Sequence, residues 1–280
     1  MGLSVMKKIL VVIAIVLTAA IIIHRNNLQP NKIAKAVPVL MYHHFEVDKN
    51  DSNDMIVKKS EFEKQMKYLK NNGYTSISIK ELKDFVEGKS MLPKNPILIT
   101  ADDGYLSNYD IMYPILKKLN MKATIFIIGN DIDNVGKTNS KLPKLTWDKI
   151  EEMYDSGIID IECHTYNSHV KGNTISGNMG IFSSPLVGET RGEYEKRINN
   201  DIEKNINAIK LNLGYEPIAF SYPYGDWSET SEKILKNNGI KFTFVASGGK
   251  EGDIQKCYLL KRLGINGNYS MKDFKQGLAK

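Results

Sequence analysis

Residues 96–105, PILITADDGY, are the stretch of the chain that decides the fold. The first half is a nearly unbroken apolar run, which is typical of strands covered on both faces of a parallel sheet. The second half places Asp102 and Asp103 at the carboxyl end of that strand, followed by Gly104, at which the backbone turns readily. Enzymes built on parallel barrels carry their reactive groups at this end of the strands. A turn or helix cap made by the same residues is the alternative interpretation.

The alternation of a short apolar run with an amphipathic stretch continues on both sides of this segment. Strands are predicted at residues 37–42, 75–77, 96–100, 123–128, 158–163, 217–222, 241–245 and 258–263. Helices are predicted at residues 60–72, 79–87, 107–119, 147–156, 192–213 and 228–238. This order predicts an α/β fold with a helix-covered parallel sheet, and specifically a distorted or incomplete (β/α) barrel with seven or eight parallel strands. A doubly wound open sheet is the second possibility.

Two polar stretches interrupt the alternation. Residues 46–59 are rich in Asp and Asn, and residues 171–188 are rich in Gly, Ser and Asn. We expect both to be long loops, which in compact domains are usually functional or mobile. Just after the first of them, Ser60 and Glu63 have the spacing of a capping box, which predicts where the next helix begins.

The N-terminal residues differ from the rest of the chain. Lys7 and Lys8 precede an apolar run at residues 9–23, which is the pattern of a signal segment. The run is shorter than the roughly 20 residues of a full membrane span, so a buried core helix is the alternative. We favour a retained anchor over a cleaved signal. The sequence therefore predicts a signal or anchor, a linker and a catalytic domain, at residues 1–26, 27–36 and 37–280.

Composition and charge limit the partners of the chain. Without three basic residues that flank the apolar run, 35 basic residues face 32 acidic ones, so the net charge of +6 falls to +3. This balance indicates no nucleic-acid partner and is compatible with an anionic cell envelope. No protein partner is implied. Cys163 and Cys257 do not form a disulfide framework, and we expect two buried free thiols.

Histidines gather behind two of the predicted strands. HTYNSH follows residues 158–163 and contains His164 and His169, while His43 and His44 follow the first strand. The five-residue spacing of His164 and His169 is not the helical i, i+4 spacing, so a loop must fold them together. This clustering is difficult to explain by packing alone.

Two histidines and one carboxylate from the Asp pair form a ligand set for a single metal ion with open coordination positions. With Zn²⁺, three protein ligands and a water make a hydrolytic centre. The remaining carboxylate then serves as a general base and a remaining histidine as a general acid. In a regular strand Asp102 and Asp103 point apart, so we expect different roles for them unless the strand end is distorted.

The third element is FSYPYGDW, residues 220–227. There the backbone N–H of Tyr224 is a candidate donor to a developing oxyanion. Tyr222 and Trp227 are candidates for stacking on a sugar ring. A packed turn is the alternative interpretation.

These three segments resemble the motifs of the polysaccharide deacetylases of carbohydrate esterase family 4. TADDG at residues 100–104 is similar to the first motif, usually TFDDG; HTYNSH is similar to the metal-binding motif; and YPYG at residues 222–225 is similar to the third. The resemblance spans residues 37–265. It is closest to the poly-β-1,6-N-acetylglucosamine deacetylases of biofilm systems, which share the longer histidine spacing and a Tyr-His pair, here Tyr42-His43.

The resemblance implies a role for each motif residue. Asp102 would be the base, and one divalent metal ion, with Zn²⁺ the first expectation, would be held by Asp103, His164 and His169. Most of the family has its acid histidine late in the chain, but no histidine follows His169 here. In the circularly permuted biofilm branch the early histidine, here His43, is the acid.

One position departs from the family. Ser221 stands where the third motif usually has an arginine that orients the base. Arg262, at the end of the last predicted strand, is the candidate substitute.

The expected function is metal-dependent hydrolysis of the N-acetyl group, a linear amide, in N-acetylglucosamine units of an extracytoplasmic polysaccharide. Peptidoglycan or chitooligosaccharides are alternative substrates. A glycoside hydrolase would need two carboxylates flanking the bond, and an iron oxygenase would not need the second aspartate. A non-catalytic sugar-binding module would not need this set of groups. The chain has neither a G-x-S-x-G elbow nor a phosphate-binding glycine loop.

Overall fold

Eight parallel strands follow one another in a sheet that is almost closed into a barrel. The computed structural model describes residue 2 and residues 37–48, 53–137, 142–246 and 254–279. Around the sheet the strands are β12 (Leu260–Lys261), β11 (Phe242–Val245), β10 (Ala219–Ser221), β7 (Ile159–Cys163), β6 (Ala123–Ile127), β5 (Pro96–Asp102), β1 (Val39–Tyr42) and β13 (Leu263–Gly264). A further short strand, β4 (Thr75–Ser76), pairs with β5. The predicted α/β class and incomplete parallel barrel are confirmed, and the open doubly wound sheet does not form.

One extended segment borders both edges of this sheet. Leu260 in β12 pairs with Phe244, and Leu263 in β13 pairs with Leu40, so two neighbouring strands of the chain complete the circle. Arg262 lies between them and is fully buried. The closure of the barrel therefore brings this arginine toward the strands that contain the first motif.

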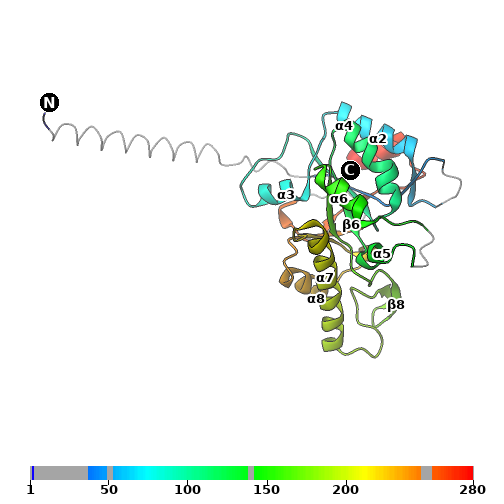
Figure 1. Cartoon of the computed structure of the whole chain (residues 1–280), viewed down its shortest axis with the longest axis vertical. Helices are drawn as coiled ribbons and strands as arrows, with labels where there is room; N and C mark the ends of the chain where they lie inside the picture. The colour runs from blue at the N-terminus through cyan, green and yellow to red at the C-terminus, as the bar shows by residue number, and fades with distance from the viewer. Residues whose placement is uncertain (1, 3–36, 49–52, 138–141, 247–253, 280) are drawn as a thin grey trace. The chain divides into compact units, whose positions relative to one another are not determined.

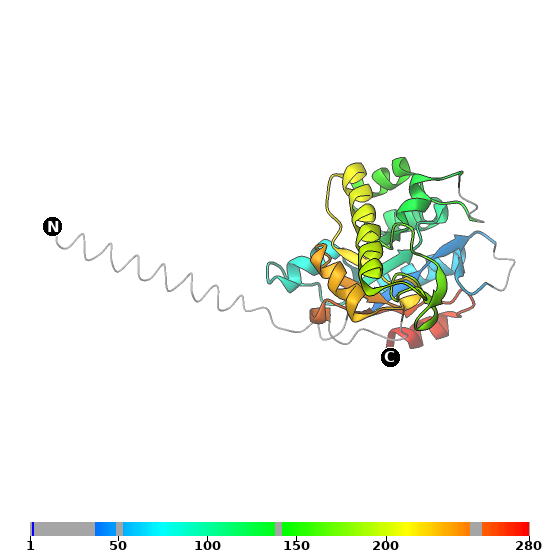
Figure 2. The same cartoon turned by 90° about the horizontal axis from the view of Figure 1, so that it is seen from below.

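Helices surround the sheet, as Figures 1 and 2 show. In chain order they are α2 (Lys59–Asn71), α3 (Ile79–Val86), α4 (Tyr113–Leu119), α5 (Gly129–Asp133), α6 (Trp147–Asp155), α7 (Arg191–Leu213), α8 (Glu229–Asn237) and α9 (Met271–Ala279). A π-helical turn, Asn108–Met112, precedes α4. All six predicted helices are found, with α4 and its π-helical turn in place of the helix predicted at 107–119. The short α5 and the later α9 were not predicted.

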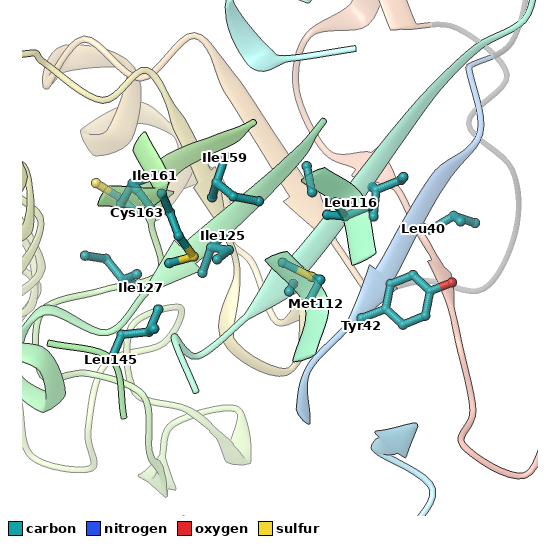
Figure 3. Packing of buried hydrophobic residues seen from close by; sticks show 14 of the residues in the cluster. Leu40, Tyr42, Met112, Leu116, Ile125, Ile127, Leu145, Ile159, Ile161 and Cys163 are labelled. Carbon is teal, nitrogen blue, oxygen red and sulfur yellow. The ribbon is translucent and has the colours of Figure 1, made fainter. Parts of the chain in front are cut away.

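Side chains alternate along the strands between two apolar clusters. Figure 3 shows the larger one, which joins strand residues such as Leu40, Ile125 and Ile161 with Met112 and Leu116. The smaller cluster fills the barrel with residues from the alternate positions, including Leu98, Phe126, Phe244 and Leu260. Because the alternation continues to the carboxyl ends of the strands, the next inward positions receive polar residues, and the candidate site lies there.

Both polar stretches that we expected to be loops contain paired strands. Short strands β2 (His44–Glu46) and β3 (Ile56–Lys58) pair in parallel, and β8 (Lys171–Thr174) and β9 (Gly177–Gly180) form an antiparallel hairpin. The hairpin forms without apolar alternation because Gly177 adopts a φ of +95° at its turn, where Thr174 donates a hydrogen bond to the Gly177 carbonyl.

The predicted capping box at Ser60 is wrong. Helix α2 begins at Lys59 and has no side-chain cap, because Ser60 already lies inside the helix. A capping box is found instead at the start of α3, between Ser78 and Glu81.

Some predictions concern residues outside the described part. The signal or anchor at 1–26 and the linker at 27–36 lie there, and the described residues from 37 onward belong to one unit, residues 34–280. Within the described ranges no helix is both long and apolar enough to cross a membrane. Neither cysteine forms a disulfide with a described residue, and only Cys163 is buried. Cys257 is half-buried because it lies in an irregular turn with a φ of +63°, so that part of the prediction is wrong.

Candidate active site

The end of strand β5 is distorted, and the distortion brings two adjacent carboxylates to one place. Asp103 has a φ of +74° and Gly104 a φ of +66°, so the side-chain alternation ends at Asp102. The Nε2 atom of His164 is 4.0 Å from Asp102 Oδ2 and 3.3 Å from Asp103 Oδ1. A left-handed conformation costs a non-glycine residue about 1–2 kcal/mol, so the surrounding contacts must stabilise it.

His164 and His169 converge on Asp103 from the loop after β7. His164 Nδ1 lies 2.6 Å from the carbonyl oxygen of Ser221, which only accepts hydrogen bonds, so Nδ1 carries the proton. In a neutral ring the Nε2 lone pair then faces Asp103, whose Oδ1 lies 3.4 Å from Nε2 of His169. The Asp103 Oδ1 atom has no hydrogen-bond partner in the described part of the chain.

This donor set fits a metal ion. Ligand atoms of Asp103, His164 and His169 all lie within 4.8 Å of one another. Buried acceptors that point at each other without a shared donor are costly unless a cation lies between them. One carboxylate and two imidazoles suit Zn²⁺ and similar divalent ions.

The charges of these groups agree with such a role. Burial, followed by the neighbouring His164, lowers the pKa of His169 to about 4, so the ring is neutral at physiological pH. Burial alone would raise the pKa of Asp103, but His164 and His169 hold it well below its usual range. Metal ligands must be deprotonated, and both conditions meet that requirement.

Helix α7 explains how two histidines five residues apart come together. Its buried Asp201 accepts hydrogen bonds, each of 2.8 Å, from three consecutive loop residues: Tyr166, Asn167 and Ser168. Asn205, one turn further along the helix, donates to the carbonyl oxygen of Thr165, which has a φ of +84°. Sequence reasoning missed Asp201 and Asn205, because their spacing on a long amphipathic helix is also that of ordinary helix positions.

Asp102 is held by the arginine at the closure of the barrel. The two Arg262 amino groups lie 2.7 Å from the two Asp102 oxygens, and Arg262 also donates to the Ser221 hydroxyl at 2.8 Å. Ser221 in turn donates to Asp102 at 3.0 Å. Burial would raise the pKa of Asp102, but the Arg262 guanidinium and His164 bring it down to about 2. Asp102 is therefore ionised. Arg262 makes the contact to Asp102 that we expected of an arginine at position 221, where this chain has serine.

The two early histidines have different surroundings. His44 is buried and fixed, with Nδ1 2.9 Å from the Ser107 hydroxyl and Nε2 3.6 Å from Glu46. His43 lines a cavity of about 200 Å³. Burial lowers the pKa of His43, while the charges of Asp102 and Asp103 raise it in part. The charges of both carboxylates therefore act on His43, whereas His44 is bound to Ser107 and Glu46.

The aromatic residues of the third motif divide between site and core. Tyr224 has a φ of +60°, and its ring centroid lies 4.9 Å from that of His169. Tyr224 and Trp227 are each 44% exposed. Tyr222 is only 1% exposed and donates its hydroxyl to Glu232, so the structure contradicts the expectation that it stacks on a sugar. Its side chain points outward to the helices because it follows Phe220 by two positions.

A parallel barrel with an Asp-His-His set and an arginine-bound second carboxylate at its carboxyl end defines the class of polysaccharide deacetylases. The family model described as polysaccharide deacetylase matches residues 89–243. The chain belongs to this family.

Known relatives agree over most of the chain. The poly-β-1,6-N-acetyl-D-glucosamine N-deacetylase of Escherichia coli K12 is 26% identical over 85% of this chain, and the one of Staphylococcus epidermidis is 31% identical over 67%. The matches span 38% and 60% of those two proteins. The solved structure of a de-N-acetylase from Aggregatibacter actinomycetemcomitans superposes with a TM-score of 0.79 at 26% identity, covering 86% of this chain and 99% of that one.

Proposed function

We propose that this protein hydrolyses the N-acetyl group of N-acetylglucosamine units in a polysaccharide, in a reaction that depends on a divalent metal ion. The observation that carries the proposal is the convergence of Asp103, His164 and His169 beside the ionised Asp102, around a buried Asp103 oxygen that no described residue hydrogen-bonds. The family and the three curated or solved deacetylases named above support the same reaction class.

Asp103, His164 and His169 would hold the ion, with Zn²⁺ favoured by two imidazoles and one carboxylate. Bound there, such an ion would polarise the acetamide carbonyl and acidify a water molecule. The remaining chemistry belongs to side chains of this chain.

Asp102 is the proposed base. Its carboxylate is 4.0 Å from His164 and is kept ionised by Arg262, so it is ready to take a proton from the attacking water. The backbone N–H of Tyr224 is the proposed oxyanion donor, because its left-handed turn is next to His169.

His43 is the proposed acid. An amide breaks only if the leaving amine receives a proton. His43 lines a cavity, and the charges of both carboxylates act on its imidazole. His44 is occupied by Ser107 and Glu46 and is a poor candidate.

The proposed substrate is poly-β-1,6-N-acetylglucosamine, in agreement with the names of the curated relatives. Peptidoglycan and chitooligosaccharides present the same acetamide and are the alternatives. A glycoside hydrolase fits less well, because Asp102 and Asp103 approach the same imidazole instead of flanking a bond. The proposed location is outside the cytoplasm, at the membrane.

Acetate release from these three polymers tests the proposal. The purified protein should release acetate from poly-β-1,6-N-acetylglucosamine, lose activity after chelation, and recover with Zn²⁺ or another divalent transition ion. Full activity in protein shown to be metal-free would exclude the metal. Reducing-end formation without acetate would indicate a glycoside hydrolase instead.

A further inference from the structure

A buried lysine lies beside the proposed metal ligands. Lys144, in the segment that leads into α6, is only 7% exposed. It lines a cavity of about 240 Å³ together with Asp103 and His169. A lysine is rarely buried unless its ammonium group has partners, because removing the charge from water is costly.

The partners of Lys144 lie around Asp103. Its Nζ atom donates to the backbone oxygen of Asp103 at 2.9 Å and lies 3.3 Å from Asp131 Oδ2. It also lies 4.1 Å from the ring centroid of Tyr105, within the range of a cation–π contact. The ammonium group is thus held on three sides, and one of these contacts fixes the main chain of a proposed ligand.

The backbone around Lys144 strengthens this arrangement. Residues 144 and 105 pair in an antiparallel bridge. Leu145 donates to the Gly104 carbonyl at 2.9 Å, and Leu106 donates to the Pro143 carbonyl at 2.8 Å. The segment at 143–145 therefore pairs with residues 104–106 as a short edge strand does, and Lys144 adds a side-chain bond to Asp103, the residue just before this pairing.

That residue is the one that needs support. Asp103 is in the left-handed conformation without being a glycine, and such a residue persists only where its surroundings over-determine it. If Asp103 relaxed to an extended φ, the strand alternation would continue and its carboxylate would point away from His164 and His169.

We propose that Lys144 is a positioning residue for the metal site: its bond to the Asp103 carbonyl holds this aspartate in the conformation that presents the carboxylate to the two histidines. The inference rests on the proposed metal-dependent function. It assigns a role to a residue for which no motif of the sequence provided a signal.

Metal affinity tests this role without relying on activity. Lys144→Met keeps the length of the side chain and removes the bond, so the affinity for Zn²⁺, measured by competition with a chromophoric chelator, should fall about 10–100-fold. The visible absorption of the Co²⁺-loaded protein should change as well. Lys149→Met is the matched control, since Lys149 lies on α6, 4.2 Å from the ring centroid of Tyr109, and its loss should leave both readouts unchanged.

Two more variants separate positioning from general stability. Lys144→Arg keeps a charged donor and should retain more affinity than Lys144→Met. Asp131→Asn leaves the bond to the Asp103 carbonyl and should lose affinity only severalfold, which also decides the matter if Lys144→Met does not fold. Unchanged affinity in Lys144→Met, or in Asp131→Asn if Lys144→Met does not fold, would overturn the inference. A wild-type protein that binds no divalent ion would instead refute the proposed function, and the inference with it.

Discussion

At the scale of single residues, Asp102 and Asp103 are chain neighbours with different partners. Asp102 is bound by Arg262, whereas Asp103 faces two imidazoles. We therefore expect Asp102→Asn to keep the metal and lose activity, and Asp103→Asn to lose metal affinity. Metal analysis of both purified variants, alongside acetate release, checks the assignment. The opposite pattern would mean that the two roles are exchanged.

His43 and His44 form a second pair of neighbours that mutation separates. His43→Ala should retain the metal but slow acetate release by about 10²-fold or more, the usual scale for general acid–base catalysis. His44→Ala, which removes a ring bound to Ser107, should have a much milder effect on rate. A general acid must be protonated, so wild-type activity should fall as the pH rises above the pKa of His43. A near-normal rate in His43→Ala, with that alkaline decline unchanged, would require another proton donor.

Arg262 controls the ionisation of Asp102. Since the folded pKa of Asp102, about 2, lies below its ordinary value of 3.8, the pair stabilises the fold above about pH 4 and this stabilisation is lost as the pH falls through about 2. Arg262→Met leaves a buried carboxylate without its cation, which should cost about 3–5 kcal/mol in the free energy of unfolding at pH 7. Burial would then raise the pKa of Asp102, so the acidic limb of the pH–rate profile should move to higher pH.

Urea unfolding at pH 7 and the pH profile of kcat/KM measure these two effects of Arg262→Met. Arg262→Lys, which keeps one charge but not the paired contact, should lie between wild type and Arg262→Met. An acidic limb that does not move in Arg262→Met would show that Asp102 does not depend on this arginine.

At the scale of elements, a carboxylate of β7 joins the sheet to the start of α3. Asp160 Oδ2 accepts the backbone N–H of Ile79 at 2.7 Å, yet burial raises the pKa of Asp160 to about 6. A raised pKa stabilises the fold fully below about pH 4 and the contribution is lost as the pH rises through about 6. Asp160→Asn keeps an acceptor oxygen and no charge, so we expect it to raise the free energy of unfolding at pH 7 by on the order of 1–3 kcal/mol.

Denaturant unfolding of wild type and Asp160→Asn at pH 4 and pH 7 measures this contribution. The two proteins should differ little at pH 4 and most at pH 7. Ser78→Ala is the control at the same end of α3, because it removes the capping hydroxyl, changes no charge and leaves the Asp160 carboxylate in place. An equal difference between wild type and Asp160→Asn at both pH values would contradict a titrating Asp160.

The elements with apolar signals were predicted from the sequence, and the others were not. Strands form at all eight predicted places, because buried parallel strands need continuous apolar runs, but the last one, predicted at 258–263, is divided into the two short strands β12 and β13. The β8–β9 hairpin was missed because its pairing depends on backbone conformations at Gly177 and not on an apolar pattern. Helix α5 is a single short turn, too brief for helical periodicity to be visible.

The sequence predicted the site residues that belong to short motifs, but not the residues that act through tertiary contacts. Asp102, Asp103, His164 and His169 stand together because strand ends meet at one edge of a barrel. The contact of Arg262 was expected only as a substitute for a missing arginine. Other contacts of the site join segments that are far apart in the chain, and no spacing of residues in the sequence predicts them. These are the hydrogen bonds of Lys144, Asp201 and Asn205.

At the scale of the whole molecule, location is the open prediction. Lys7, Lys8 and the apolar run at 9–23 predict that the deacetylase unit is tethered to a membrane and works outside the cytoplasm. Cell fractionation should find the full chain with membranes, and a version that begins at Val37 should be released from them. Full-length protein in the cytosol would refute the tether, and a natural N-terminus near Val37 would indicate cleavage.

The closure of the barrel by β12 and β13 has a consequence for folding during synthesis of the protein. Asp102 and its arginine partner are 160 positions apart in the chain. During synthesis, the strand that carries the aspartate pair leaves the ribosome long before the segment that completes the circle. A nascent chain therefore cannot assemble its reactive centre until that late segment has been made, so a polypeptide truncated before Arg262 would lack the cation that keeps its base ionised.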